Sequence, residues 1–213
     1  MSLHFHVGRD EEARDLIETY HYSGRWPGNV QVVGSWHEDG GLFGDAGPIV
    51  AACIFSIPPT RWSENVLELS RLCRREDVRP QLSGLIAETA RWTKKFGADL
   101  LVSFADDTHN HHGGIYQACS WAFDGKRERR MDGLVVNGEF VAGRSANSRW
   151  GTRSPSRLQQ QIGAHHEIVP HYDAGKYLYW RALTRAGRRK AQRLGLQAVA
   201  YPKPHKEIAI AAG

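Results

Sequence analysis

The spacing of hydrophobic and polar residues along this chain predicts a fold of mixed helices and strands. Apolar residues recur at helical spacing in two segments, Asp10–Tyr20 and Leu82–Phe96. Asp10 is the expected N-cap of the first helix, and Gly97 is expected to end the second. Patterns typical of strands lie at Leu3–Gly8, Val30–Trp36 and Pro48–Ile57.

The middle of the chain has the order strand, helix, strand, helix. Val66–Leu72 alternates apolar and polar residues, and the helix Leu82–Phe96 follows it. The apolar segment Asp99–Ala105 then predicts a buried strand, and Gly114–Ala122 a second, short helix. Such an order favours parallel strands, because the helix returns the chain to the same end of the sheet. We therefore expect an α/β fold with a mixed sheet.

The last third predicts a hairpin, two further helices and one more strand. Arg129–Val141 is centred on Asn137-Gly138, a strong turn signal. The other expected elements are a helix at Ser154–Ile162, an aromatic strand at Gly175–Leu183 and a basic helix at Thr184–Leu194. Ala198–Gly213 has two prolines and a run of small residues, which predicts a loose tail.

The composition is that of one domain, with a small appendage at most. The 213 residues are 41% hydrophobic and 24% charged, which is ordinary for a globular protein. No apolar run approaches the roughly 20 residues of a membrane span, and the N-terminus does not resemble a signal peptide. The three cysteines are far apart, which favours neither a disulfide framework nor a zinc site. We expect a reduced, cytoplasmic protein.

Basic residues are concentrated in three runs, and aromatic residues lie between them. The net charge is +5 and the isoelectric point about 9.2. A single basic run is usually a solvated face, but three runs with interleaved aromatics favour a nucleic acid partner. The residues expected to contact DNA phosphates are Arg25, Arg144, Arg149, Arg153, Arg188, Arg189 and Lys190.

Four short segments carry residues suited to catalysis. They read HYSGR at 21–25, ELSRL at 68–72, LVSFAD at 101–106 and GGIYQA at 113–118. Asp106 closes a predicted strand, and open α/β sheets bind ligands at the carboxyl ends of strands. Tyr116 follows Gly113-Gly114 at a helix start, where backbone N–H groups can hold an anion. Each residue alone also has a structural interpretation: Asp106 as a turn residue, Arg71 as an ion-pair partner, Tyr116 as core.

These segments together resemble the Mom family of phage proteins, and the likeness extends with gaps from about Tyr20 to Leu183. The resemblance implies a GNAT-like acyltransferase fold, with a catalytic domain at 1–183 and a basic helix and tail at 184–213. It implies conversion of adenine in double-stranded DNA to N6-(carbamoylmethyl)adenine, which protects phage DNA from restriction in the host cytoplasm. By motif position, the functional residues are Tyr22, Arg71, Ser103, Asp106 and Tyr116.

The resemblance also suggests a role for each of these residues. Asp106 is expected to be the general base or to orient the adenine amino group, and Tyr116 to protonate the leaving group. Tyr22, in a loop predicted at His21–Asn29, would stack on or hydrogen-bond the base. Arg71 would hold the donor, together with the glycines Gly84, Gly113 and Gly114. Adenine inside a duplex is out of reach, so the base must flip out of the stack.

The sequence leaves the identity of the acyl donor undecided. GNAT enzymes hold a diphosphate with a loop of the form Q/R-x-x-G-x-G/A, and here Gln81–Ile86 fits only at Gly84. Ile86 is expected to crowd such a cradle, which weakens the case for coenzyme A. The product group, N–CH2–CO–NH2, has the atoms of a glycyl unit. We therefore hypothesise glycyl-tRNA as donor, which makes tRNA a second partner, with acetyl-CoA and a later amination as the competing idea.

Three other functions fit parts of the sequence. An adenine N6-methyltransferase is disfavoured, because Ser56–Thr60 has two prolines but neither the acid or amide nor the aromatic of its motif. A GNAT N-acetyltransferase for a small molecule or protein has the same fold, and fold does not fix substrate. A DNA-binding protein without catalysis needs only the basic third. An iron site from Asp106, His109 and His111 or His112 is conceivable, although clustered histidines are more often simply exposed.

Overall fold

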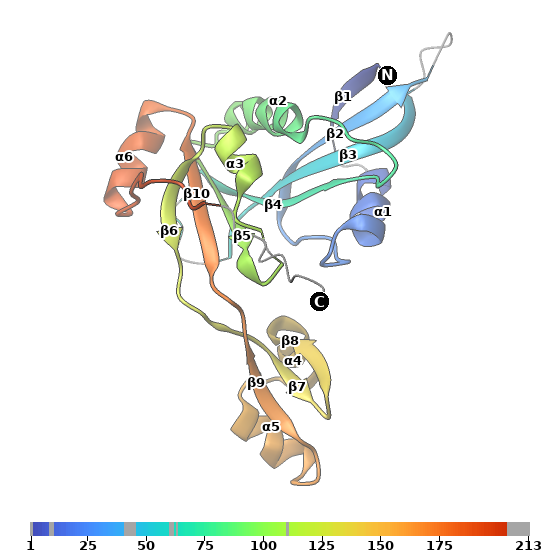
Figure 1. The fold of residues 1–213 in the computed structure, drawn as a ribbon, viewed down its shortest axis with the longest axis vertical. Helices are drawn as coiled ribbons and strands as arrows, with labels where there is room; N and C mark the ends of the chain where they lie inside the picture. Colours follow the sequence, from blue (N-terminus) through green and yellow to red (C-terminus); the bar gives the residue numbers. More distant parts are fainter. Residues whose placement is uncertain are drawn as a thin grey trace, which may run out of the picture. The chain divides into compact units, whose positions relative to one another are not determined.

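The computed structural model describes residues 2–8, 11–40, 46–59, 62, 64–109 and 111–203, and within them the chain forms two compact units (Figure 1). The first unit contains the described residues up to Phe104, together with Gly113–Gly125 and Leu178–Lys203. The second contains Ala105–His112 and Lys126–Tyr177, and most of it is inserted between two strands of the first.

The first unit is built on a seven-stranded sheet with the order β1-β2-β3-β4-β5-β10-β6. Its strands are β1 (Leu3–Val7), β2 (Val30–Asp39), β3 (Ala46–Ser56), β4 (Val66–Arg74), β5 (Leu100–Asp106), β6 (Ala122–Lys126) and β10 (Lys176–Ala182). The strands β1 to β4 pair antiparallel in turn, and β4 pairs parallel with β5. The parallel pair confirms the expected strand–helix–strand unit, and the sheet is mostly antiparallel.

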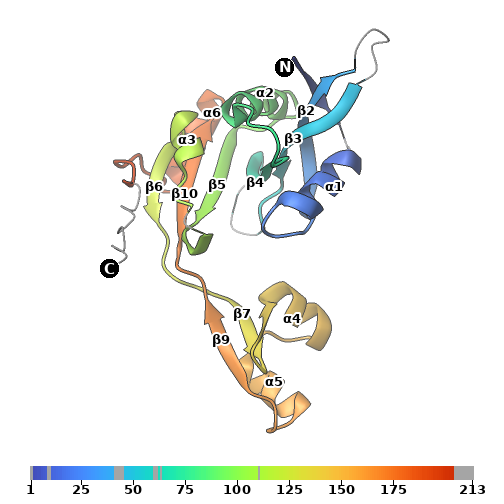
Figure 2. The same cartoon turned by 45° about the vertical axis from the view of Figure 1, so that its right-hand side comes forward.

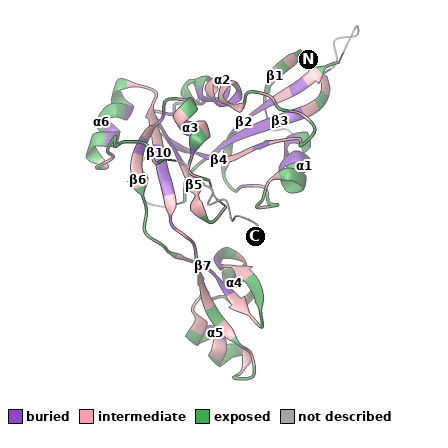
Figure 3. Ribbon diagram, viewed as in Figure 1, coloured by how far each residue is buried: buried purple, intermediate pink, exposed green. Residues whose placement is uncertain are grey.

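Two helices of this unit cover opposite faces of the sheet (Figure 2): α1 (Glu11–Tyr20) and α2 (Leu82–Lys95). Helix α1 buries Leu16 and Ile17 in a cluster with Val33, Ala52 and Ile54. The alternate residues Gly34 of β2 and Cys53 of β3 lie beside Thr89 of α2 instead. Neighbouring residues of a strand point to opposite faces, so the two helices lie on opposite sides. Figure 3 shows the buried residues gathered in this sheet and the inner sides of its helices.

Helix α6 (Arg185–Arg193) is fixed to the sheet by polar contacts at its N-terminus. The Thr184 hydroxyl accepts a hydrogen bond from the Gly187 N–H at 3.0 Å and donates to the Asp99 carboxylate at 2.6 Å. The side chain of Lys190 is buried, donates to the Glu64 carbonyl and lies 3.7 Å from the Asp99 carboxylate. The expected basic helix is present, and one of its cations is used internally.

The second unit has an antiparallel sheet of its own with the order β8-β7-β9. The elements are β7 (Met131–Val136), β8 (Glu139–Ala142), β9 (Ile168–Tyr172), α4 (Gly143–Trp150) and α5 (Pro155–Ile162), with a short 3₁₀ helix at Asp107–His109. The turn between β7 and β8 places Asn137 and Gly138 at φ of 51° and 84°, which confirms the hairpin. Leu134, Ala146 and Leu158 form the core between sheet and helices.

Four of the described elements were not expected, namely the 3₁₀ helix Asp107–His109, β6, α4 and β9, and the expected helix at Gly114–Ala122 is shorter. Helix α3 spans only Gly114–Ala118, and strand β6 follows at once. Helix α4 consists mainly of glycine, serine, asparagine and arginine, so its pattern of apolar residues is weak. Strand β9 contains Pro170, which argues against a strand except at a sheet edge, and β9 is an edge strand.

Some expectations lie beyond what these residues test. Asp10 and the tail from Pro204 fall outside the described residues. The domain boundary after Leu183 remains a prediction, since the compact units divide the chain at other positions. No described helix has both the length and the apolar character needed to cross a membrane. The three cysteines are free thiols.

Gly187→Ala should destabilise the protein, because a Cβ there would lie 1.9 Å from the backbone oxygen of Asp99. Alanine favours a helix by about 1 kcal/mol over glycine, so any net loss must come from this clash. We expect about 1–3 kcal/mol lower free energy of unfolding, measured by urea titration. Gly28→Ala is the control, because a Cβ at Gly28 meets nothing within 4 Å. Equal stability of the two variants would contradict this account of α6.

Candidate active site

Two of the residues predicted from sequence, Ser103 and Tyr116, lie where β4 and β5 separate. Residues Val66 to Glu68 of β4 pair with Leu100 to Val102 of β5, and the pairing then stops. Both strands continue, β4 to Arg74 and β5 to Asp106. From Leu69 and Ser103 onward, therefore, the two parallel strands no longer form a ladder.

A bulge in β4 explains the separation. The register between β3 and β4 shifts so that Ile54 faces Arg71 but Phe55 faces Leu69, which leaves Ser70 as the extra residue. The Ser70 hydroxyl donates to the Ile54 carbonyl at 3.2 Å and lies 2.8 Å from the Ser56 hydroxyl. Such a bulge bends and twists its strand. Serine at this position is what lets the bulge satisfy its own polar groups.

Ser103 bridges the two strands at the first position where they no longer pair. Its buried hydroxyl lies 2.8 Å from the Leu69 carbonyl and 2.8 Å from the Tyr116 hydroxyl. A carbonyl can only accept and serine has one proton. Both contacts are therefore satisfied together when Ser103 donates to Leu69 and Tyr116 donates to Ser103. The structure thus brings together two of the predicted catalytic residues.

Tyr116 is held in an aromatic cluster. Its ring centroid lies 5.5 Å from that of Trp121 and 5.2 Å from that of Tyr179. Burial raises the pKa of the Tyr116 hydroxyl well above its usual value, and the hydrogen bond to Ser103 offsets only part of this effect. Tyr116 therefore keeps its proton at neutral pH, as a proton donor must.

Two further residues act electrostatically on Tyr116. Tyr22 and Glu68, like Cys53, each raise the pKa of its hydroxyl by Coulomb interaction, after the larger effect of burial. Tyr22 is 56% exposed and lies against the His21 ring, with centroids 4.3 Å apart. Glu68, in the last paired position of β4, was not among the predicted site residues. Its position in the ELSRL segment, where only Arg71 was singled out, was the available signal.

The predicted donor-binding residues have structural partners. Arg71 donates from Nη1 to the Ser70 carbonyl at 2.6 Å and from Nε to the Arg25 carbonyl at 3.1 Å. Gly113 has φ of 83°, and a Cβ on it would lie 2.2 Å from the Tyr179 ring. Gly114 begins α3, which at five residues has little dipole for an anion. Their binding roles remain predictions.

The loop before α2 differs from an open diphosphate cradle. The Gly84 N–H donates to the Gln81 carbonyl at 2.9 Å, and a Cβ on Gly84 would lie 3.2 Å from the Trp36 ring. A side chain at this position of α2 would make a tight contact, and the Trp36 ring would have to move by a few tenths of an ångström to admit it. The side chain of Ile86 is fully buried, so it belongs to the core and does not crowd the loop as expected.

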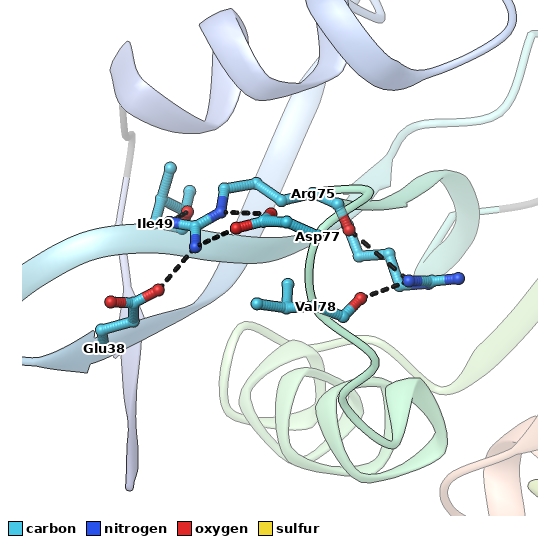
Figure 4. Close-up of polar contacts among 6 residues, drawn as sticks. Glu38, Ile49, Arg75, Asp77 and Val78 are labelled. Atoms are coloured by element: carbon cyan, nitrogen blue, oxygen red, sulfur yellow. Dashed lines mark hydrogen bonds and ion pairs between the residues drawn. The ribbon is translucent and has the colours of Figure 1, made fainter. Parts of the chain in front are cut away.

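Ion pairs fix the start of this loop (Figure 4). Arg75 donates to Glu38 at 2.6 Å and to both carboxylate oxygens of Asp77, at 3.0 and 2.9 Å. The hydrogen bond to Arg75 lowers the pKa of Asp77. Arg74 donates to the Val78 carbonyl. The two arginines therefore fix the conformation of this loop through contacts within the chain.

Asp106 belongs to the second unit and pairs there with a lysine. One carboxylate oxygen lies 3.1 Å from Lys176 Nζ, and the other accepts the Thr108 N–H at 3.1 Å. Burial raises the pKa of Asp106, but Lys176 and Thr108 together outweigh it, so the pKa lies below its ordinary value. Asp106 is therefore a stable anion, which suits an acceptor better than a general base. Its pairing with Tyr116 in catalysis remains a prediction.

The predicted DNA-binding residues are exposed, with one exception. Exposed side chains are those of Arg25, Arg144, Arg149, Arg153, Arg188 and Arg189. Lys190 is buried, and its ammonium group is bound to Glu64 and Asp99, so we no longer expect it to contact phosphate. The six arginines remain predicted phosphate contacts.

No group of three potential metal ligands occurs within the part of the chain that the structure describes. His111 and His112 are described, whereas the side chain of His109 lies outside the described residues. The iron site considered from the sequence therefore has no support in the described residues.

A family model described as the Mom protein family matches residues 2–203. The chain belongs to the Mom protein family. Among curated proteins, none matches the sequence. The Mom family resemblance deduced from four short segments is thus confirmed over nearly the whole chain.

The fold of this Mom family member is that of the GNAT acetyltransferases. A protein from Salmonella typhimurium described as an acetyltransferase, solved with its cofactor acetyl-CoA, has a TM-score of 0.50 at 7% identity. The similarity covers 87% of this chain and 96% of that one. The ribosomal-protein-S18-alanine N-acetyltransferase from Escherichia coli gives 0.49 at 10% identity, covering 87% and 97%. At these identities the likeness concerns fold alone.

Ser103→Ala should destabilise the protein more than Tyr116→Phe. Without Ser103, the Tyr116 hydroxyl and the Leu69 carbonyl are both left buried and unpaired, at about 1–3 kcal/mol. Tyr116→Phe leaves the bond from Ser103 to Leu69 intact and should cost about 1 kcal/mol or less. Urea unfolding measures both, and the double variant should cost less than the sum. A larger loss of stability for Tyr116→Phe would contradict the hydrogen-bond directions given above, in which Tyr116 donates to Ser103 and Ser103 to Leu69.

Proposed function

We propose that this protein is a DNA-modifying transferase that converts the adenine N6 amino group in DNA to an N6-(carbamoylmethyl) group. The observation that carries the proposal is the buried, protonated Tyr116, which is hydrogen-bonded to Ser103 where β4 and β5 separate. Membership of the Mom family and the GNAT fold support it. A phage-encoded protein with this activity would protect its DNA from restriction.

Tyr116 is the proton donor in this proposal. The attacking nitrogen forms a bond to the donor's carbonyl carbon, and the bond from that carbon to the leaving group breaks. Tyr116 then protonates the leaving atom, and the tyrosinate takes up the proton that the attacking nitrogen loses. The Ser103 hydroxyl can turn from the Leu69 carbonyl to the Tyr116 oxygen, because it lies 2.8 Å from both. A hydrogen bond from Ser103 would stabilise the tyrosinate left behind.

Asp106 acts as an anionic acceptor for the adenine amino group. Its lowered pKa keeps it ionised at neutral pH, and a carboxylate accepts N–H hydrogen bonds. Lys176 holds this charge in place. The amino group of adenine is a weak nucleophile, so orienting its N–H bonds and lone pair is a useful contribution.

Two donors are compatible with the proposal. An acyl-CoA donor is supported by the acetyl-CoA bound to the Salmonella protein of the same fold. Glycyl-tRNA is favoured by the chemistry of the product and by the Gly84 N–H, which is already hydrogen-bonded to Gln81. Transfer from glycyl-tRNA gives N6-glycyladenine and releases the tRNA 3′-hydroxyl. The carbamoylmethyl product is an isomer of this amide, so an intramolecular rearrangement balances without a further reactant.

A GNAT N-acetyltransferase for a small molecule or protein is the second candidate. The shared fold favours it, and it would use the same protonated tyrosine. A DNA-binding protein without catalysis is the third, but it gives no reason for a buried Tyr116–Ser103 pair. Analysis of nucleosides distinguishes the three, because only the proposed enzyme changes adenine in DNA.

Mass spectrometry of nucleosides from DNA of cells expressing the protein should show N6-(carbamoylmethyl)deoxyadenosine. Tyr116→Phe removes only the hydroxyl and should lower the rate of modification by about 10² to 10⁴. Asp106→Asn should also abolish most of it, because the anionic acceptor is lost. Phe96→Ala, at a 64% exposed position at the end of α2, is the control and should behave as wild type. DNA with unmodified adenine, from cells containing folded protein, would refute the proposed function.

The donor is tested with purified protein and duplex DNA. Glycyl-tRNA should give modified adenine, and acetyl-CoA alone should give none, since an acetyl group lacks the product's second nitrogen. Uncharged tRNA with free glycine is the control for activation of the glycyl carbon. Modification from acetyl-CoA and DNA alone would eliminate the glycyl donor.

A further inference from the structure

One face of the sheet in the second unit carries exposed apolar and aromatic side chains. Val136, Val141 and Ile168 pack with α4 and α5 against Leu134, so these residues define the covered face. Because side chains alternate along a strand, the neighbours of these residues lie on the opposite face.

The open face is centred on Val135. Its register partners are Phe140 on β8 and Val169 on β9, and these two side chains are 49% and 45% exposed. His171, two residues after Val169, lies on the same face. We call Val135, Phe140, Val169 and His171 the open face.

The Phe140 ring packs against Gly133. A Cβ on Gly133 would lie 2.5 Å from Phe140 Cε2, so only glycine lets the ring rest on the sheet in this position. The His171 ring meets Phe140 edge-on, with centroids 4.7 Å apart, and His171 Nδ1 is fixed by Asp132 at 2.7 Å. A ring held in this way, and still half exposed, offers a flat surface at little further cost in conformational entropy.

The segment that forms this sheet is basic. Residues 126–177 contain nine Lys or Arg and five Asp or Glu, an excess of four in a chain whose net charge is +5. Arg144, Arg149, Arg153 and Arg157 are exposed on α4, on α5 and between them. Among the described residues, no carboxylate is in ion-pair contact with any of these four arginines. Arg129 lies over the exposed ring of Tyr172 at the end of β9, 5.9 Å from its centroid.

We propose that the open face binds unpaired bases of a DNA strand by stacking, with exposed arginines of the same basic segment on its phosphates. An aromatic ring on an open sheet, combined with basic side chains, is the arrangement that binds single strands with little sequence preference. The excess of positive charge favours a polyanion over a second copy of the same basic segment. The choice of DNA rests on the proposed function, since flipping an adenine leaves its partner base unpaired.

Fluorescence anisotropy with full-length protein and a labelled 12-nucleotide DNA strand tests this proposal. Phe140→Ala should weaken binding roughly 5- to 100-fold, the usual effect of removing one stacking ring, without changing the slope of log affinity against log salt. Arg144→Gln with Arg153→Gln should make that slope shallower by about 0.7 per lost phosphate contact. Phe140→Trp should retain affinity. Phe96→Ala is the matched control, an exposed phenylalanine of the first unit that should bind as wild type.

The outcomes separate this proposal from the function proposed above. Unchanged affinity of Phe140→Ala, with a melting temperature near that of wild type, would overturn stacking even if the protein modifies adenine. So would a dimer that Phe140→Ala converts to a monomer, or much tighter binding of RNA than of DNA of the same sequence. A loss confined to Phe140→Ala, with Phe140→Trp intact, supports the open face even if no modified adenine is found.

Discussion

Strands β4 and β5 stop pairing after three residues, because the bulge at Ser70 turns β4 away, and the arrangement of hydroxyls around Tyr116 depends on that separation. Where a ladder would otherwise continue, the Leu69 carbonyl is bonded by a side chain, Ser103. The same serine accepts from Tyr116, so the bulge, the strand separation and the orientation of the phenol form one connected set of hydrogen bonds. In a buried setting each unmade bond would be costly, which gives the set a single arrangement.

The two predicted acid–base residues have different charge states, one neutral and one anionic, because their surroundings differ. Tyr116 lies among aromatic rings, where loss of its proton would create a buried anion, so it stays neutral. Asp106 is also partly buried, but Lys176 and Thr108 stabilise its charged form. A neutral donor and a permanent anion are the states that proton delivery and amine orientation require.

The two units have separate structural roles. The first has the GNAT fold, with its strand separation and tyrosine. The second is inserted between β6 and β10 and carries much of the excess positive charge on a small sheet with its own core. A self-contained core lets such an insertion vary in surface without disturbing the sheet that holds Tyr116 and Ser103.

The sequence by itself determined the parts that depend on local spacing. Apolar periodicity gave the strand–helix–strand unit, Asn137-Gly138 gave the hairpin, and four short segments gave the Mom family and most of the residues around the site. Tertiary structure decided what side chains do once distant segments meet. Gly84 looked like part of a phosphate loop, but it lies in α2 against the Trp36 ring, 48 residues earlier, where a Cβ would make a tight contact. Lys190 looked like a phosphate contact on a basic helix, but Glu64 and Asp99 hold it internally. Such contacts join residues far apart in the chain, and neither composition nor periodicity contains that information.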